Sequence, residues 1–414
     1  MYIQDLNMKR IAITGMGAVT PIGDSVAEFW KNLVEGRSGI GRLDRFVNDE
    51  IPVRVAAEVR DFNAADHMPR RIAKDSSLFA QYAFAAAAEA LAQSRLDTAA
   101  EGWRTGLVMG TSMSGIVDIA GTQEEMTRSG ESKVSPRFVP KILGNIAAAQ
   151  IAIEYGLYGP SMTVSTACSS GGDAIKLAMM MLESGEADAM LAVGAESIIC
   201  PLVTSSLSMA KALSREEDPA LACRPFDLNR NGFVMGEGGG ALILETEEHA
   251  RARGAEILGY VLAAANNNDA YHVTSPAPDG HGAKACMKAA LAAAGLEPGD
   301  IGYINARGTS TPVGDKVEIS AIKEVFGGCR PAVSSTKAAT GHMMGAGGIT
   351  ETIACVMACR EGILPATLNT AEPDPACEGA DIVTGEARKT PVRYAMSNAF
   401  GFGGQNSSII VSAE

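Results

Sequence analysis

The strongest constraint on the fold is a regular alternation of short apolar runs with longer helical patterns along the chain. Strand-like runs such as "RIAITGMG", "GLVMGTS", "ADAMLAVGAES" and "GGALILE" alternate with helical patterns over 76–93, 171–184, 283–294, 315–326 and 348–361. Alternation of this kind predicts an α/β architecture with largely parallel strands that helices cover on both faces. The 45 glycines fit many tight turns and closely packed helices.

The chain is also twofold in plan. Residues 161–184 read as strand, small-residue turn and helix, and residues 332–361 repeat that order with "SSTKAATGHMMGAGG" as the turn. This pattern predicts a duplicated half, and we place the division between 1–255 and 256–414. No Pro-rich or low-complexity break separates the halves, so we expect one body. In such sheets ligands bind at the carboxyl ends of strands.

Charge and segment composition exclude several classes of function. A net charge of −13 argues against a nucleic-acid partner, because phosphate binding needs a basic face. No apolar run reaches the roughly 18 residues that a membrane span needs. The first residues, "MYIQDLNMKR", include an acid and lack the apolar core of a signal peptide, so we expect a cytoplasmic protein.

The cysteines do not have the spacing of a metal site. Of the eight cysteines only Cys355 and Cys359 are close, and they lack a second pair of ligands. We therefore expect no zinc or other metal, and no cofactor.

Cys168 differs from the other cysteines in its surroundings. In "VSTACSSGGDAIKLAM" it follows a β-branched strand and precedes a helix that begins with small residues. The N–H groups and positive dipole end of a helix N-terminus favour thiolate, so we expect a lowered thiol pKa. Small neighbours also let a substrate approach and supply an oxyanion donor. The alternative is a buried, inert cysteine. The position favours a nucleophile.

Two histidines are candidates for work beside this thiol. His342 lies with Lys337 on the small-residue loop "SSTKAATGH", which enters a helix that carries Glu351. Histidine is the usual hydrogen-bonding or proton-transfer partner of a thiolate. The alternative is a helix-capping histidine beside a solvated lysine. His272, in "NNNDAYHVTSP", fits equally a loop histidine and a residue that binds a water behind the reacting groups.

Two further loops end strands. "YINARGTSTPVGDKVE" presents Arg307 at a strand end, as a catalytic donor or as an ordinary surface charge. "SNAFGFGGQNSS" lets Phe402 present both a backbone N–H and a movable ring, because glycines surround it.

The order and spacing of "TACSSG", "NARGTSTPVGDKVE", "SSTKAATGH" and "NAFGFGGQN" resemble the β-ketoacyl-acyl-carrier-protein synthases, particularly those of the synthase II type. The likeness extends from "IAITGMGAVTPIG" to the last strand. It implies a thiolase-like fold of five layers, αβαβα, with two pseudo-symmetric halves. It also implies a homodimer, or a heterodimer with a related subunit, and acyl- and malonyl-loaded acyl carrier protein as partner. Fatty-acid and type II polyketide synthesis fit the resemblance alike.

The resemblance implies a role for each motif residue. Cys168 takes an acyl group from the carrier protein, and His342 donates a hydrogen bond to the malonyl thioester oxygen as CO₂ is lost. Lys337 orients this network with support from Glu351. The backbone N–H groups of Cys168 and Phe402 form the oxyanion hole, and the Phe402 ring gates the acyl pocket.

Two more positions correspond to functional residues of the family. Met113, in "GTSMSGIVD", matches the residue that limits acyl length. Arg307 departs from the family, whose loop reads Asn-Ala-His-Gly-Thr and whose histidine is the second donor to the enolate oxygen. We expect Asp315 and Glu318 to draw the arginine aside, and condensation to weaken.

Three interpretations follow from this departure. The chain is an elongating synthase with Arg307 as donor, an acyl-transferring homologue that does not elongate, or a chain-length-factor-like partner subunit. The intact "TACSSG" counts against the last, since that class usually lacks the cysteine. A thiolase needs a second cysteine near "FGFGGQN", and this segment has none. The synthases that prime fatty-acid synthesis carry Asn where this chain has His342, so they fit poorly as well.

A local basic patch is expected to bind the carrier protein despite the net negative charge. The candidates are Arg70, Arg71 and Lys74 in "HMPRRIAKDSS", with Lys133 and Arg137. Steering by such a patch weakens with salt. The alternative is ordinary solvated surface charge.

Overall fold

One sheet of eleven strands runs through residues 9–414, the part of the chain that the computed structural model describes. Its order is β12-β10-β9-β14-β15-β8-β1-β7-β6-β4-β5. The strands of the first half are β1 (Ile11–Val19), β4 (Thr105–Gly110), β5 (Ser161–Val164), β6 (Ala189–Glu196) and β7 (Gly238–Thr246). Those of the second are β8 (Gly259–Asn268), β9 (Ile301–Asn305), β10 (Ala332–Ser334), β12 (Asp381–Ile382), β14 (Tyr394–Phe400) and β15 (Gln405–Ser412).

The two halves repeat one topology. From the outer strand inward, β5-β4-β6-β7-β1 pair as parallel, parallel, antiparallel and antiparallel. The series β10-β9-β14-β15-β8 pairs in the same sequence of directions. Antiparallel pairing of β1 with β8, from Ile11 to Ile13, joins the halves. The expected duplication is therefore present in the strands themselves.

The expectation of a largely parallel sheet is wrong, because the inner strands of each half are antiparallel. The connection from β14 to β15 gives the physical reason. Only residues 401–404 separate these strands, and so short a connection joins antiparallel neighbours, whereas a parallel pair needs a long crossover.

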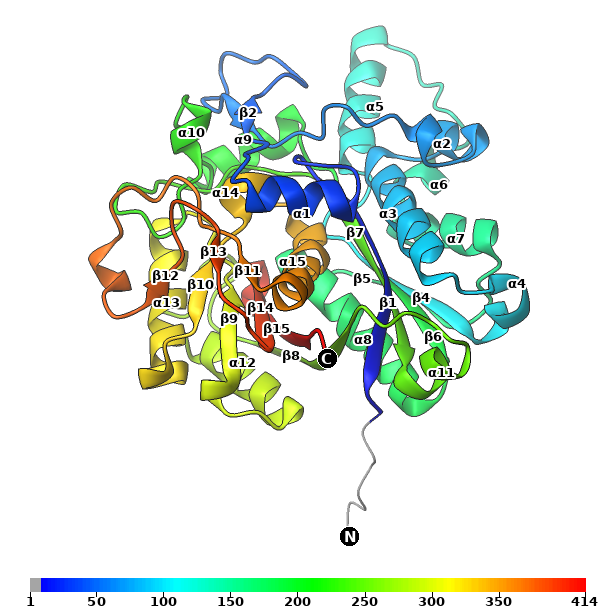
Figure 1. Ribbon diagram of the computed structural model, residues 1–414. Coiled ribbons are helices and arrows are strands. Elements are labelled where there is room, and N and C mark those ends of the chain that lie inside the picture. Colours follow the sequence, from blue (N-terminus) through cyan, green and yellow to red (C-terminus); the bar gives the residue numbers. More distant parts are fainter. Residues whose placement is uncertain (1–8) are drawn as a thin grey trace.

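Five layers result from this arrangement (Figure 1). Helices α8 (Ser170–Ser184) and α15 (Gly347–Glu361) lie between the halves and pack on strands of both. Helices α3 (Leu78–Ser94) and α7 (Gly144–Tyr155) cover the outer face of the first half, and α12 (His281–Ala294) and α13 (Pro312–Phe326) cover that of the second. The αβαβα architecture expected from the sequence is confirmed.

Glycines let the two central helices approach each other at their N-termini. A Cβ on Gly171 would lie 2.8 Å from the carbonyl oxygen of Gly345, and one on Gly348 would lie 2.5 Å from the backbone nitrogen of Gly172. Both distances are shorter than a carbon atom tolerates. The close contact brings the turn before α8 and the turn before α15 together at one end of the sheet.

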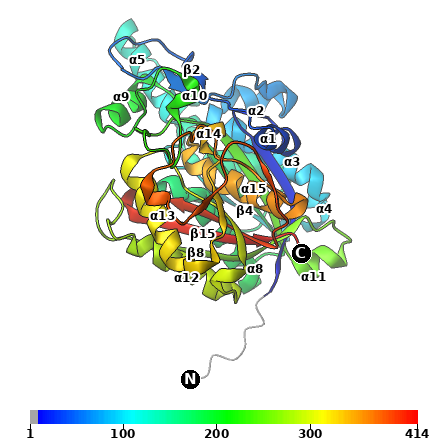
Figure 2. The same cartoon turned by 60° about the vertical axis from the view of Figure 1, so that its left-hand side comes forward.

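The other elements are shorter. They are α1 (Val26–Val34), β2 (Gly41–Arg42), β3 (Val55–Ala56), α2 (Arg70–Asp75), α4 (Thr98–Glu101), α5 (Ile116–Ser129), α6 (Phe138–Ile142), α9 (Pro201–Met209), α10 (Pro219–Ala222), α11 (Glu247–Ala252), α14 (Lys337–Thr340), β11 (Ile363–Leu364) and β13 (Arg388–Lys389). Figure 2 shows β2, α5, α9 and α10 gathered at one end of the body. Within residues 9–414 no helix is long and apolar enough to cross a membrane. The prediction about a signal peptide concerns the first ten residues, of which 1–8 lie outside the described part.

Candidate active site

Four strand ends meet at one cavity of about 370 Å³. Cys168 follows β5, Arg307 follows β9, His342 follows β10, and Phe402 follows β14. The other lining residues are Ala210, Lys211, Ala212, Phe233, Thr274, Ser275, Pro276, Thr311, Pro312, Val313, Gly314 and Met344. The structure thus brings together the side chains that the sequence motifs singled out.

Cys168 lies on a tight turn between strand and helix. The residue before it, Ala167, has a φ of 52°, in the left-handed region that L-residues rarely adopt. Ser170 holds this turn, because its Oγ accepts from the N–H of Thr166 at 2.9 Å and donates to the carbonyl of Ala167 at 2.6 Å. Local strain that is over-determined in this way is typical of functional positions.

The Cys168 thiol is buried among donors and apolar atoms. Its Sγ is 3.1 Å from Nε2 of His342 and 3.9 Å from Sδ of Met344, and the backbone N–H of Phe402 donates to it. Burial raises the pKa of the thiol, although the charge of Arg307 and the Phe402 N–H oppose the rise. The expected lowering of this pKa is therefore wrong, because desolvation outweighs the favourable donors.

His342 is fixed by its backbone. Its N–H donates to the carbonyl of Val234 at 2.8 Å, and its own carbonyl accepts from Gly236 at 2.9 Å. The ring meets the Phe233 ring edge-on at a centroid distance of 5.3 Å. Burial, with the charges of Lys337 and Arg307, holds the pKa of His342 well below its usual value. The imidazole is therefore neutral and has a single N–H to donate.

Lys337 and Glu351 form a buried ion pair behind this histidine. Only 2% of Lys337 and 4% of Glu351 are exposed, and the Nζ donates to Oε1. Burial raises the pKa of Glu351, and the charge of Lys337 opposes that rise. The solvated lysine weighed as an alternative is thus not what the structure shows. The pair links α14 to α15 and so holds the loop that carries His342.

Arg307 has a different environment. Its backbone N–H and that of Gly308 donate to the two carboxylate oxygens of Glu318, both at 2.8 Å. Asp315 accepts from the backbone N–H groups of Phe226 at 3.0 Å and Ser310 at 3.1 Å. Glu318 therefore binds backbone, and Asp315 pairs with Arg230 at 3.7 Å, whereas the Arg307 guanidinium forms no ion pair within residues 9–414. The expectation that they draw Arg307 aside is wrong.

Burial also changes the protonation of the two acids near Arg307. Desolvation raises the pKa of Glu318 to about 7 and raises that of Asp315, while hydrogen bonds from backbone N–H groups and the charge of Arg307 oppose both shifts. Near neutral pH, Glu318 is thus partly protonated.

The glycine-rich loop places Phe402 against the nucleophile. A Cβ on Gly401 would lie 3.0 Å from the backbone nitrogen of Cys168, so a larger residue would press on the turn that carries the nucleophile. Gly403 has a φ of 82°, and its N–H donates to the carbonyl of Val273 at 2.6 Å. The Phe402 ring packs on the apolar cluster that includes Cys168. The Phe402 N–H therefore lies at the Cys168 thiol, where a backbone donor can serve an oxyanion hole.

Two other candidates lie away from the reacting groups. Met113 is 37% exposed, donates its N–H to Glu196 at 3.1 Å and does not line the Cys168 cavity. His272 is exposed, and its Nδ1 accepts from the N–H groups of Thr274 and Ser275 at 3.1 and 3.2 Å. Of the two readings of His272, the loop histidine is the one that the structure shows.

Several contributors to the site carry no distinctive motif in the sequence. Glu196 accepts from the backbone N–H groups of Ser112 at 2.7 Å and Gly345 at 3.2 Å, and so ties the loop after β4 to the turn before α15. The only sign of Glu196 in the sequence is an acid near the end of the apolar run "ADAMLAVGAES". Met344 and Phe233 line the cavity, but their patterns do not differ from those of core residues.

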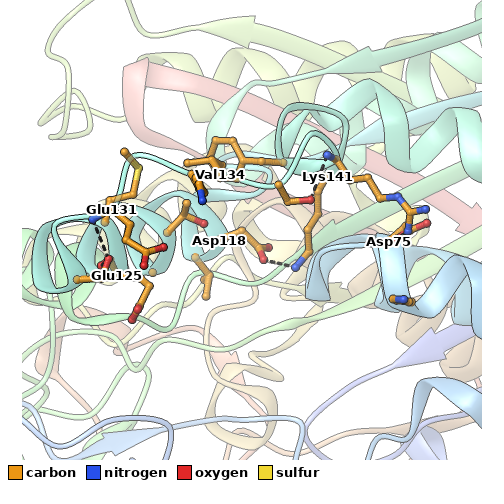
Figure 3. Close-up of a pocket in the computed structure, with 16 residues that line it drawn as sticks. Asp75, Asp118, Glu125, Glu131, Val134 and Lys141 are labelled. Carbon is orange, nitrogen blue, oxygen red and sulfur yellow. Dashed lines mark hydrogen bonds and ion pairs between the residues drawn. The ribbon is translucent and has the colours of Figure 1, made fainter.

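The candidate docking residues lie around a second, larger groove of about 600 Å³ between α2, α5 and α6. Lys74, Lys133 and Arg137 line it, but so do several acids. Figure 3 shows Asp118 and Lys141 paired there, at 2.5 Å. Arg137 pairs with Asp75 at 2.6 Å, and Arg71 pairs with Glu154, while Arg70 is exposed. The surface is therefore mixed in charge rather than uniformly basic.

Over residues 9–414 the structure shows no cluster of three or more His, Cys, Asp or Glu side chains that would hold a metal ion.

Comparison with known proteins gives consistent results. Sequence models of the "Beta-ketoacyl synthase, N-terminal domain" and "Beta-ketoacyl synthase, C-terminal domain" match residues 8–250 and 255–371. The chain is 40% identical over 407 residues to 3-oxoacyl-[acyl-carrier-protein] synthase 2 of Staphylococcus aureus (strain COL), covering 97% of this chain and 98% of that protein.

Two solved structures are similar throughout. The ishigamide ketosynthase/chain length factor has a TM-score of 0.92 and 33% identity, covering 98% of this chain and 99% of that one. A type II polyketide ketosynthase, bound to the hexaketide and in complex with its acyl carrier protein, has a TM-score of 0.88 and 32% identity at the same coverage.

Proposed function

The chain belongs to the β-ketoacyl synthase family, and from that premise we propose a two-step acyltransferase reaction in which Arg307 slows the second step. The family's activity is carrier-protein-dependent condensation in fatty-acid or polyketide synthesis. The observation that carries the assignment is the contact of 3.1 Å between Cys168 Sγ and His342 Nε2 inside a cavity that Arg307 also lines.

The first step loads the enzyme. The Cys168 sulfur attacks the thioester carbonyl of an acyl group on acyl carrier protein, the bond from carbon to the carrier's sulfur breaks, and the thiol proton passes to the departing thiolate. The oxyanion that forms accepts from the backbone N–H groups of Cys168 and Phe402. Because burial raises the pKa of Cys168, deprotonation of the thiol accompanies its attack. The Phe402 ring gates the acyl pocket.

The second step forms the carbon–carbon bond. Malonyl carrier protein loses CO₂, and the electron pair of the broken bond forms an enolate. The enolate carbon attacks the acyl–Cys168 carbonyl, and the cysteine leaves as thiolate. The neutral His342 donates its Nε2–H to the enolate oxygen, and the Lys337–Glu351 pair keeps the histidine loop in place.

Arg307 occupies the position of the second enolate donor. Its guanidinium still offers N–H groups, but it is longer and more flexible than an imidazole. Loss of one well-placed oxyanion donor costs roughly 3 kcal/mol, or about a hundredfold in rate. We therefore propose near-normal acylation of Cys168 and condensation slower by about a hundredfold. The surroundings of Cys168 support this difference between the two steps, since His342 and the Phe402 N–H both contact the thiol.

A non-elongating acyl-transferring homologue is the second candidate. The unpaired Arg307 favours it, because a charged group at this position suits binding of an acid better than loss of CO₂. A partner subunit is less well supported: one similar structure is a ketosynthase/chain length factor, yet Cys168 here is present and fully assembled.

Acyl carrier protein is the proposed macromolecular partner, as in the ketosynthase complex that this chain resembles. The outer strand β5 is partly exposed, and Met162 on it is 43% exposed, which supports pairing with a second copy or a related subunit. We also propose a cytoplasmic location and a division of the chain into two halves between residues 255 and 256. Met113 is proposed to limit acyl length across such a subunit interface.

Intact mass spectrometry with acyl- and malonyl-carrier protein tests the assignment. We expect an acyl adduct, mapped by peptide analysis to 161–176, and slow formation of β-ketoacyl carrier protein. An adduct spread over Cys200 or Cys355 contradicts the nucleophile. Absence of any adduct contradicts the acyltransferase assignment, and fast product formation contradicts the role given to Arg307.

A further inference from the structure

Asp173 is a buried acid that neither reaction step uses. It lies in the first turn of α8, the helix that follows Cys168, and only 4% of it is exposed. A buried charge is costly unless it is paired or hydrogen-bonded. Within residues 9–414 its carboxylate accepts from three side chains, those of Thr166, Ser169 and Asn266. The acid is therefore committed to contacts around the nucleophile.

Two of these contacts lie on either side of Cys168. Thr166 donates its Oγ1–H to Oδ2 of Asp173 at 2.6 Å. The hydroxyl of Ser169 is shared between the carbonyl of Thr166, at 2.8 Å, and the same Oδ2, at 3.3 Å. One oxygen atom thus contacts the residues that enclose the strained Ala167, whose φ is 52°. A strained turn persists only where several contacts determine it.

The other oxygen of the acid reaches the second half of the chain. Oδ1 of Asp173 accepts from Nδ2 of Asn266, on β8, at 2.9 Å. Lys176 donates to Oδ1 of the same amide, so both ends of the Asn266 side chain are engaged. A Cβ on Gly172 would collide with Oγ of Ser407 on β15, so this turn of α8 lies directly against the second half. A network whose members are hydrogen-bonded in this way rigidifies the segments that it joins.

The groups that contact the Cys168 thiol belong to that second half. His342 Nε2 lies 3.1 Å from Sγ, and the Phe402 N–H donates to it. The thiol belongs to the first half, so its alignment depends on links between the halves. We propose that Asp173 is a positioning residue, which holds the turn through Asn266 so that the thiol meets both groups. The inference rests on the proposed function, because it is acyl transfer that needs this alignment. A displacement of about 1 Å can slow a reaction about a hundredfold.

Thr166→Val tests this proposal without a change of charge. Valine has nearly the size of threonine, so the thiol stays buried and loses only its alignment. We expect acylation of Cys168 by acyl carrier protein to slow about tenfold in a single turnover, with the half-saturating carrier concentration unchanged. Thr166→Ser keeps the hydroxyl and should restore the rate. Thr352→Val is the matched control, because that hydroxyl donates to the carbonyl of Gly348 within α15 instead, and it should change the rate by less than about twofold.

A readout without carrier protein separates positioning from a general loss of stability. Alkylation of Cys168 by iodoacetamide, followed on the 161–176 peptide, gives the pH midpoint at which the thiolate forms. Because the Phe402 N–H favours thiolate, the midpoint in Thr166→Val should rise by about 0.5–1 pH unit, as the loss of one hydrogen bond implies. The midpoint in Thr352→Val should not move. A midpoint unchanged by Thr166→Val, or an equal rise in Thr352→Val, overturns the proposal.

Asn266→Ala breaks only the link between the halves. This residue is exposed, so the variant should fold, and acylation should slow about threefold to tenfold. In the double variant with Thr166→Val the two effects should not multiply, because both act through Asp173 on one turn. An acylation rate unchanged by Asn266→Ala, or effects that multiply, overturns the positioning role. If the unmodified chain takes no acyl group from carrier protein while the alkylation midpoint still rises in Thr166→Val, the proposed function fails and the positioning role stands.

Discussion

His342 and Arg307 follow neighbouring parallel strands of the same half, yet the two loops that carry them are built in opposite ways. The His342 loop is neutral as a whole: a buried imidazole of lowered pKa contacts Cys168, and the ion pair of Lys337 with Glu351 lies behind it. The Arg307 loop presents an unpaired positive charge over a helix N-terminus.

The two loops also use their buried acids differently. Glu351 binds a lysine side chain, whereas Glu318 binds only the backbone N–H groups of Arg307 and Gly308. One loop therefore holds a proton donor in a fixed position, and the other leaves a flexible cation free to meet substrate. We infer that acylation and condensation depend on separately built parts of one cavity.

The largest expected effect is that of removing the histidine. His342→Ala should lower condensation by about a thousandfold, because a positioned hydrogen-bonding or proton-transferring side chain contributes roughly 100- to 10,000-fold. The measurement is β-ketoacyl product formed per unit time from pre-acylated enzyme. His281→Ala is the control, and it should stay within about twofold of the unmodified chain, since this exposed side chain pairs with Asp279 and does not line the cavity. If the two substitutions lower condensation equally, His342 does not have the proposed role in condensation.

The next effect is on stability. Lys337→Met leaves the buried carboxylate of Glu351 without its partner and should lower the free energy of unfolding by roughly 3–5 kcal/mol at pH 8. The loss should shrink as pH falls, because burial raises the pKa of Glu351 and its protonated form needs no cationic partner. Denaturant titration measures it. The double variant Lys337→Met with Glu351→Leu should recover most of the loss, and a double variant as unstable as the single one would show that the pair is not what holds this loop.

Glu318, which binds the backbone of the Arg307 loop, should also make the free energy of unfolding depend on pH. Burial raises the folded-state pKa of Glu318 to about 7 from the ordinary 4.5, so its protonated form contributes stability below about pH 4.5 that is lost as pH rises to about 7. This contribution is at most about 3 kcal/mol. In denaturant titrations, the stability difference between the unmodified chain and Glu318→Gln should change across this window, while Glu248→Gln, an exposed control, should show no such change. A flat difference for Glu318→Gln would contradict the burial of its charge.

The smallest effect is expected outside both loops. Reversing Arg70 and Arg71 to Glu should raise the KM for carrier protein about threefold to tenfold at low salt, by the loss of electrostatic steering. Because docking precedes both steps, acyl- and malonyl-carrier protein should be affected alike. Arg251→Glu on α11 is the control. An unchanged KM would show that Arg70 and Arg71 do not contribute to docking of the carrier protein.

Much of the fold was predictable because the apolar runs are long and regular. The helix expected over 171–184 is observed as α8 over Ser170–Ser184, and that over 348–361 as α15 over Gly347–Glu361. Strand β14 was not predicted separately, because Ser397 and Asn398 interrupt its apolar character. Its antiparallel hairpin with β15 is one reason that the sheet is not largely parallel.

The site was predictable in membership but not in electrostatics. The ends of β5, β9, β10 and β14 converge as the strand-end rule requires, so Cys168, Arg307, His342 and Phe402 meet. Whether Glu318 binds a guanidinium or a backbone depends on side-chain directions that sequence spacing does not contain. The direction in which the Cys168 pKa shifts likewise depends on how deeply the thiol is buried, and both halves of the chain contribute to that burial.

Arg307→His is the sharpest test of the proposed separation of the two steps, because it restores the histidine of the family and leaves His342 and the Phe402 N–H in place at Cys168. The measurement is paired: the rate of Cys168 acylation by acyl carrier protein, and the rate of CO₂ release and β-ketoacyl product from malonyl carrier protein. We expect acylation unchanged within about twofold and condensation raised about a hundredfold, as the gain of one oxyanion donor implies. If the chain with Arg307 already condenses as fast as the Arg307→His variant, the arginine is a competent donor and the proposed separation of the two steps is wrong.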